Sequence, residues 1–120
     1  MSDITFANTP ASTVTLSASG AKVASGAATA VTGLAAANNL VIQLEVTAAS
    51  GTTPTLDVIV QDTVDGTNYY TIATFAQKTG TGTEVIRLAT PFTDTLKVSW
   101  TIGAIANPSF TFSVKAFADA

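Results

Sequence analysis

The chain has 120 residues, no cysteine, no histidine and few charged side chains, 5 basic and 8 acidic. This length suits one domain. The missing residue types exclude a disulfide framework, thiolate or imidazole metal ligation, a cysteine nucleophile and a histidine-based triad. The net charge of −3 and the scattering of the cations argue against a nucleic-acid partner, and no apolar run approaches the roughly 18 residues of a membrane span.

Residues 1–35 differ from the rest of the chain, because Ala, Ser, Thr and Gly dominate them and large apolar side chains are few. The sequence predicts weak strands at 13–17 and 27–31. Two interpretations stay open: edge strands with a frayed terminus, or an arm that orders only on a partner. At 33–39 three alanines are too few for a stable helix, so a helical turn or a bulged loop is expected. Residues 36–120 are expected to form the core of the same domain.

Four later stretches alternate apolar and polar residues with the period of a half-buried strand. In the first, the polar Gln43 and Glu45 alternate with leucine, isoleucine and valine. The four stretches are 40–46, 56–61, 96–102 and 110–115. Weaker candidates at 70–75 and 84–88 bring the total to about eight. The side chains expected to face the core are Leu40, Ile42, Leu44, Val46, Leu56, Val58, Val60, Leu96, Val98, Trp100, Ile102, Phe110, Phe112 and Val114.

Turn signals separate these strands, at 50–54, 64–68, 79–82 and 106–108. The Asp65-Gly66 pair suits the positive φ of a tight turn. Short strands at this spacing, rich in β-branched threonine and valine, are typical of antiparallel sandwiches rather than of βαβ units. We therefore predict an all-β fold, a single antiparallel β-sandwich or jelly roll of about eight short strands.

The sequence offers only weak candidates for a metal site or a catalytic site. The stretch 62–68 offers several oxygen ligands for Ca²⁺, but its spacing is not that of an EF-hand loop, so a plain hairpin turn is favoured. Glu45 and Asp57 could serve glycoside hydrolysis, yet both are expected on outward strand faces of a domain too small for the cleft. Ser50 and Ser99 lack a histidine base and a Ser-x-x-Lys spacing. We therefore predict no enzyme activity and no catalytic, cofactor-binding or metal-ligating residue.

The aromatic residues admit two interpretations. Tyr69 and Tyr70, together with Trp100, could form a platform on which a sugar stacks. Trp100 lies in the inward register with Val98 and Ile102, however, so we favour a core position for it. One of the two adjacent tyrosines is expected to face inward on a strand.

The outward strand positions are rich in uncharged hydroxyl groups. Sheets of monomeric proteins are usually protected by lysine and glutamate, and charged residues are depleted in interface cores because they are costly to desolvate. A surface without those charges therefore suits burial against another protein. The threonines expected to face outward are Thr71, Thr74, Thr83, Thr95, Thr101 and Thr111.

The turn-and-strand pattern of residues 46–114 resembles the small all-β virion proteins of tailed bacteriophages. The stretches that carry the resemblance are 46–56, 60–70, 96–101 and 108–114. The resemblance implies a capsid-associated β-sandwich, a decoration (cement) protein that sits on the major capsid protein lattice, often as a trimer. It transfers no functional residue, because its motifs are structural.

The expected function is thus that of a structural virion protein on the capsid surface, stabilising the phage head. The start of the chain, Met1–Ile4, lacks the basic and apolar regions of a signal peptide, so synthesis and folding in the host cytoplasm are expected. A head-tail or tail component of the same particle shares these features. A carbohydrate-binding β-sandwich module is the third possibility, with Trp100 or Tyr69 at its binding surface.

Overall fold

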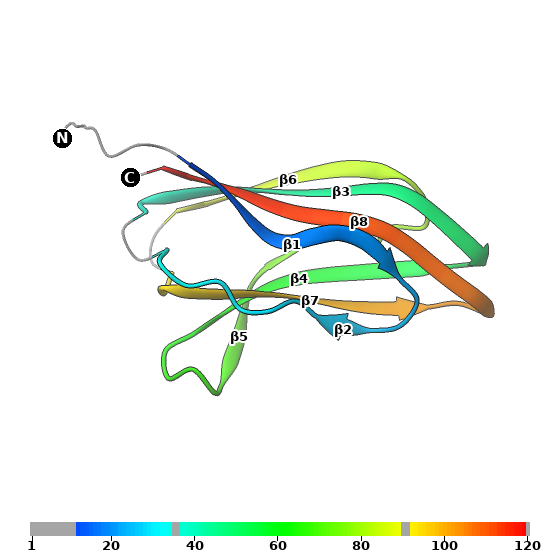
Figure 1. The fold of residues 1–120 in the computed structure, drawn as a ribbon, viewed down its shortest axis with the longest axis horizontal. Helices are drawn as coiled ribbons and strands as arrows, with labels where there is room; N and C mark the ends of the chain where they lie inside the picture. The colour runs from blue at the N-terminus through cyan, green and yellow to red at the C-terminus, as the bar shows by residue number, and fades with distance from the viewer. Residues whose placement is uncertain (1–11, 35–36, 90–91, 120) are drawn as a thin grey trace.

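The computed structural model describes residues 12–34, 37–89 and 92–119, and strands are the regular structure in these ranges. Eight strands form two four-stranded sheets that pack face to face (Figure 1). The strands are β1 (Ser12–Lys22), β2 (Gly26–Ala27), β3 (Asn39–Thr52), β4 (Thr55–Thr63), β5 (Tyr69–Thr74), β6 (Gly82–Ala89), β7 (Thr95–Gly103) and β8 (Ala106–Asp119). The predicted all-β fold is confirmed. The strands are not all short, because β3 and β8 have 14 residues each, against a usual length of about 5–6.

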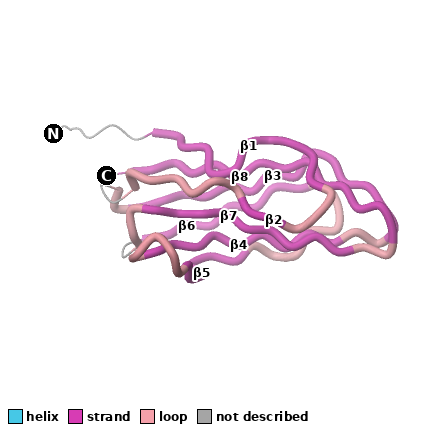
Figure 2. Tube along the Cα trace, turned by 60° about the horizontal axis from the view of Figure 1, so that its bottom comes forward, coloured by secondary structure: helices cyan, strands magenta, loops and turns pink. Residues whose placement is uncertain are grey.

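The strand order identifies the sandwich as a jelly roll. One sheet has the order β1-β8-β3-β6 and the other β2-β7-β4-β5, and all neighbours are antiparallel. Strands pair first with last, second with seventh, third with sixth and fourth with fifth, as in a long hairpin rolled into two layers. Most strands run along the long axis, and the segment after β2 also runs alongside them (Figure 2).

Alternating side chains of both sheets fill the space between them. Along β3, Leu40, Ile42 and Leu44 are fully buried while the residues between them are exposed or half-buried. The same alternation in β4 and β7 places their valines and leucines in the core. The predicted inward positions are therefore confirmed, except that Ile102 is half-buried at the margin of the core. Burying alternate apolar residues is the main stabilising contribution of such a sheet.

Two of the predicted turns have different bounds. The 50–54 turn is reduced to residues 53–54, because residues 50–52 belong to β3. Residues 106–108 belong to β8, which pairs with β3 as far as Thr52 and Ala106. The connections that remain are short, with Thr53 at a φ of 47° after β3. Asn107 at a φ of 50° and Gly51 at a φ of 115° mark an irregularity within this pairing. Gly and Asn tolerate such a backbone inside a strand as well as in a turn, so composition alone misplaced these boundaries. The turn at 64–68 is confirmed, and that at 79–82 ends where Gly82 begins β6.

The N-terminal third contributes edge strands to both sheets. β1 extends the predicted 13–17 strand to 11 residues along the edge of one sheet. The predicted 27–31 strand is reduced to β2 and an isolated bridge between Val31 and Leu96. At 33–39, the Ala37 N–H donates to the Leu34 carbonyl oxygen at 3.1 Å, which closes one turn. Residues 1–11 and 35–36 lie outside the described residues, and so does that part of the predicted arm.

The two lateral sides of the sandwich differ. On the β5–β6 side, Phe75 is buried and its N–H donates to the Val58 carbonyl oxygen at 3.0 Å. Glu84 of β6 accepts from the Ala76 N–H at 3.0 Å and forms an ion pair with Lys78, which joins the two sheets across this side. On the β1–β2 side, the outer edges of both sheets border a groove.

Candidate functional site

The acidic stretch 62–68 is a self-contained hairpin turn. Asp65 accepts from the N–H groups of Thr67 and Asn68 at 2.9 and 2.8 Å, from the Asn68 side-chain amide at 2.9 Å and from the Thr63 hydroxyl at 3.2 Å. These bonds lower the pKa of Asp65 well below its usual range, the Asn68 N–H contributing most. Because hydrogen-bond donors of the turn itself already surround the carboxylate, this geometry fits the predicted hairpin turn better than a calcium site. Among the described residues no group of three or more acids is placed to share a metal ion.

The two carboxylates considered for glycoside hydrolysis lie on different sheets. Glu45 is exposed on β3 of one sheet, whereas Asp57 on β4 of the other accepts from the Gln77 amide at 3.1 and 3.3 Å. Both alternate with buried residues, so each faces outward as predicted. They therefore flank no common substrate position. Ser50 is exposed near the end of β3, and the Ser99 hydroxyl donates to the Gln61 side-chain oxygen at 2.7 Å.

Trp100 is a core residue, as predicted. Its side chain is only 8% exposed, it contacts Phe112 edge-on with ring centroids 5.4 Å apart, and its indole N–H donates to the Ala24 carbonyl oxygen at 3.0 Å. The Lys22 ammonium lies over the indole, 5.4 Å from the centroid. The ring therefore has little free face on which a sugar could stack.

One tyrosine has the expected inward register, because Tyr70 lies opposite Asp62, which lies opposite the buried Leu96. Neither tyrosine is buried in the core, however. Tyr69 is half-buried under the Lys97 ammonium, which lies 3.8 Å from the ring centroid, and Tyr70 is 63% exposed. The pair begins β5, an edge strand, beside the β4–β5 turn and beyond the reach of the core. Lys97 and Trp100 are three residues apart on β7, an odd separation, and so point to opposite faces of the sheet. Tyr69 and Trp100 thus form no shared platform.

The outward threonines are where the alternation places them. Thr71, Thr74, Thr83 and Thr101 are exposed, and Thr95 and Thr111 are half-buried. The structure divides them between two outer surfaces of different character. On the outer surface of the β1-β8-β3-β6 sheet, charged Lys115, Arg87 and Glu45 are exposed among them.

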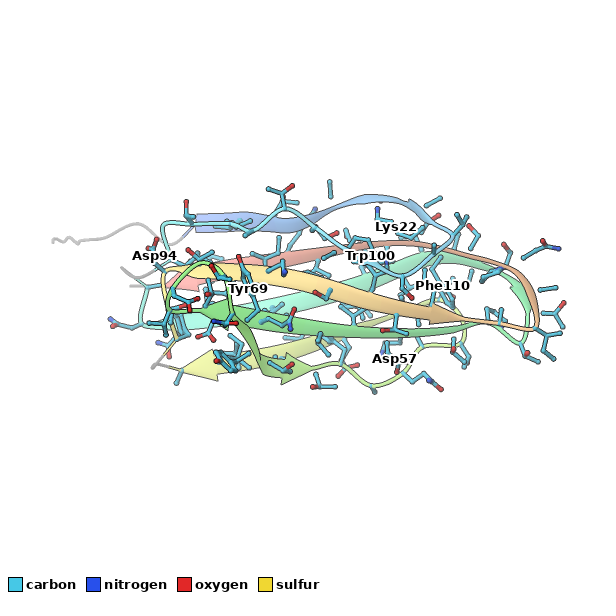
Figure 3. All side chains as sticks on the ribbon, turned by 90° about the horizontal axis from the view of Figure 1, so that it is seen from below. Lys22, Asp57, Tyr69, Asp94, Trp100 and Phe110 are labelled. Atoms are coloured by element: carbon cyan, nitrogen blue, oxygen red, sulfur yellow. The ribbon has the colours of Figure 1, made fainter. Side chains whose placement is uncertain are left out.

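The outer surface of the other sheet is poor in free charge, and Figure 3 is viewed from that side. Opposed pairs of β4 and β7 share this surface, because directly opposite residues of antiparallel strands point the same way. We call it the β4–β7 face, and it consists of Asp57, Ile59, Gln61, Lys97, Ser99 and Thr101.

Each charged group of the β4–β7 face already has a partner within the chain. Lys97 lies over Tyr69, Asp57 accepts from Gln77, and Ser99 donates to Gln61. Ile59 lies between them, half-buried. Covering this face with another protein would desolvate one cation and one anion that are both already engaged, which lowers the cost of burial.

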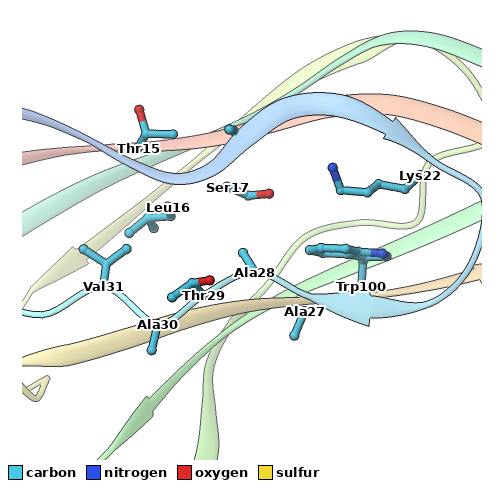
Figure 4. Close-up of a pocket in the computed structure, with 11 residues that line it drawn as sticks. Thr15, Leu16, Ser17, Lys22, Ala27, Ala28, Thr29, Ala30, Val31 and Trp100 are labelled. Atoms are coloured by element: carbon cyan, nitrogen blue, oxygen red, sulfur yellow. The ribbon is translucent and has the colours of Figure 1, made fainter.

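Sequence reasoning missed the groove on the β1–β2 side (Figure 4). It has a volume of about 640 Å³ and lies between β1 and residues 27–31, with Trp100 at one end. The lining includes Ser17 and Lys22, neither of which belongs to a motif. Their placement depends on irregular pairing of β1 with β8, and no sequence signal marks those bulges.

The part of the chain that the structure describes contains no helix with the length and hydropathy of a membrane span.

Neither a scan against protein-family models nor a search of curated proteins finds a match for this chain.

Proposed function

We propose that this chain is a non-enzymatic structural protein of a tailed-bacteriophage particle, a decoration (cement) protein that binds the major capsid protein on the outer surface of the head. The observation that carries the proposal is the β4–β7 face. It is a sheet surface whose two charges are engaged within the chain, with an isoleucine among neutral polar groups. Such a surface suits permanent burial against a protein partner.

Two further features support this proposal. The strand and turn pattern of residues 46–114 resembles small virion proteins of tailed phages, and the jelly roll is a common architecture of viral capsid domains. The same architecture also occurs in lectins, and a fold does not imply a function. The surface therefore carries more weight than the topology.

The proposed mechanism is additive burial. A standard protein interface buries about 800 Å² on each partner, and one sheet face together with its flanking loops can supply an area of that order. Homo-oligomers of this protein, with trimers favoured, would bridge neighbouring capsid subunits. Because many copies bind one symmetric shell, modest individual contacts sum to a large effect on its stability.

Purified capsids that lack the protein provide the test. Adding the protein should give saturable binding and raise the temperature at which the shells disassemble. Thr101→Lys places a new charge on the β4–β7 face, and Thr83→Lys places the same charge on an exposed strand position of the other sheet. We expect Thr101→Lys to weaken binding at least tenfold and Thr83→Lys to leave it unchanged. If the unmodified protein neither binds nor raises the disassembly temperature, the proposal is wrong.

A head-tail or tail component of the same particle would use the same kind of surface. Copy number per virion separates the two, because a decoration protein scales with the capsid lattice whereas a connector or tail part occurs in a few rings. Quantitative mass spectrometry of purified virions measures it directly.

A further inference from the structure

The groove on the β1–β2 side is bordered by two strand edges. β1 pairs only with β8, and β2 only with β7, within the described residues. The backbone groups on the outer edges of both strands therefore lack strand partners there. From Thr15 to Lys22 the groove follows β1 for roughly 20 Å, at about 3.3 Å per residue. Its opposite wall is the small-residue segment 27–31.

Ser17 supplies a buried hydroxyl with no partner. An irregularity in the β1–β8 pairing on either side of Ser17 accompanies burial of both Leu16 and Ser17. Ser17 is only 4% exposed, and its hydroxyl makes no hydrogen bond to any described residue. Figure 4 shows its oxygen directed into the space between β1 and Ala28. Buried polar groups are normally hydrogen-bonded, so this hydroxyl is an available donor or acceptor for a ligand in the groove.

Lys22 supplies an unpaired positive charge. Its ammonium lies 5.4 Å from the Trp100 ring centroid and 5.7 Å from that of Phe112. Among the described residues no carboxylate lies within ion-pair distance of it, and no acidic residue lines the groove. The groove therefore presents one cation, the buried Ser17 hydroxyl, the further hydroxyls of Thr15 and Thr29, and an apolar floor that includes Leu16 and Val31. This combination favours a carboxylate joined to an apolar body.

We propose that this groove binds an extended peptide segment whose acidic side chain pairs with Lys22 and hydrogen-bonds Ser17. An extended segment is favoured over a compact molecule because the groove is long and because free strand edges are recognised by strand addition. The small side chains of Ala18 and Ala28 leave room between the walls for the side chains of such a segment. The site lies on the lateral side of the sandwich, so it does not depend on the β4–β7 face.

Trp100 is the one tryptophan of the chain and lines the groove, so its fluorescence reports occupancy. The probe is the blocked peptide acetyl-Ala-Asp-Val-Thr-Val-amide, and its matched control carries Asn in place of Asp. We expect the Asp peptide to change the emission of the full chain saturably and the Asn peptide to bind at least fivefold more weakly. Amide chemical shifts should change first at Ser17, Ala18 and Thr29.

Two variants locate the interaction. Lys22→Met should weaken the Asp peptide to the level of the Asn peptide, and Ser17→Ala should weaken it a few-fold. Arg87→Met removes one positive charge from an exposed position of β6, at the opposite edge of the sheet from β1, and should leave peptide binding unchanged. If Lys22 only protects an exposed strand edge, as inward-pointing charges can, Lys22→Met will leave peptide binding unchanged, and the proposal is overturned.

The proposed occupant is a segment of another protein, and the test separates it from the one acidic residue of 1–11, Asp3. We expect Asp3→Asn to have no effect and the peptide to bind the unmodified chain. If Asp3→Asn instead shifts Trp100 emission without added peptide and strengthens binding of the Asp peptide, the occupant is this chain and the assignment to a partner is overturned. If neither the peptide nor Asp3→Asn affects Trp100 or the groove amides, the groove is not a peptide site. Capsid binding is unaffected by that result, so failure of this proposal is distinguishable from failure of the proposed function.

Discussion

Asp65 shows how a single side chain can build a turn. Four hydrogen bonds converge on its carboxylate, two of them from consecutive backbone N–H groups. Ser17 shows the opposite case, a polar side chain that the fold buries without a partner among the described residues. The first residue stabilises the fold it belongs to, whereas the second costs stability unless a ligand satisfies it.

The stabilising effect of Asp65 should depend on pH. Because its pKa is lower in the folded state than in the unfolded state, Asp65 stabilises the fold above its unfolded pKa of about 4. That contribution is lost as the pH falls toward the folded-state pKa. Denaturant unfolding between pH 7 and pH 2 should show Asp65→Asn less stable than the unmodified chain at neutral pH, with the difference shrinking in acid. Asp57→Asn controls for loss of a carboxylate, and a difference that stays constant with pH would contradict the prediction.

Replacing Ser17 should reveal the cost of its unpartnered hydroxyl. Ser17→Ala removes the polar group while keeping the small volume, so we expect the free energy of unfolding to rise by about 1 kcal/mol. Thermal and urea denaturation measure it. Thr63→Val is the matched control, because the buried Thr63 hydroxyl donates to Asp65 and accepts from the Gly66 N–H, so its removal should lower the stability. A loss of stability on Ser17→Ala would show that this hydroxyl is satisfied in solution.

Among the strands, β3 and β8 are the two long central strands of their sheet. They pair with each other over nearly their full 14 residues, and each also pairs with an edge strand of the sheet. Where the pairing becomes irregular, Gly51 comes so close to β8 that an added Cβ would lie 2.7 Å from the Asn107 carbonyl oxygen. This glycine is therefore required both by its positive φ and by the close approach of a second backbone.

Gly51→Ala should consequently be strongly destabilising. The unfavourable φ alone accounts for about 1–3 kcal/mol, and the contact with backbone atoms of β8 adds to it. Gly80→Ala is the control, because nothing lies within 4 Å of its added Cβ. Guanidinium unfolding followed by circular dichroism should show a clear shift of the midpoint for Gly51→Ala and almost none for Gly80→Ala. Equal shifts would mean that the β3–β8 irregularity is not rigid.

At the scale of the whole molecule, one hydrophobic cluster joins both sheets. It includes Leu16 and Leu34 from the N-terminal third together with residues of β3, β4, β7 and β8. The β1 and β2 strands also cover edges of β8 and β7 that would otherwise be free. Residues 12–34 thus contribute to the core, rather than only flanking it.

Removal of residues 1–35 should therefore abolish stable folding. The truncated chain would lose two core leucines and expose two long strand edges, which favours aggregation. Leu16→Ala is the milder variant, with an expected loss of about 2–5 kcal/mol. In the full chain, Trp100 fluorescence and far-ultraviolet circular dichroism should report one coincident unfolding transition. A soluble, cooperatively folding fragment 36–120 would contradict this account.

The all-β class, the number of strands and the inward faces of β3, β4, β7 and β8 could be predicted from the amino-acid sequence alone. This was possible because alternation with a period of two is a local property, readable within a few residues. Tertiary structure decided the jelly-roll order, the extension of β3 and β8 beyond their predicted turns, and the exclusion of both tyrosines from the core. It also decided that the charge-poor surface belongs to one sheet and that Ser17 and Lys22 share a groove. These features depend on which distant strands pair and on where that pairing becomes irregular. Neither the pairing nor its irregularities can be read from a local sequence pattern.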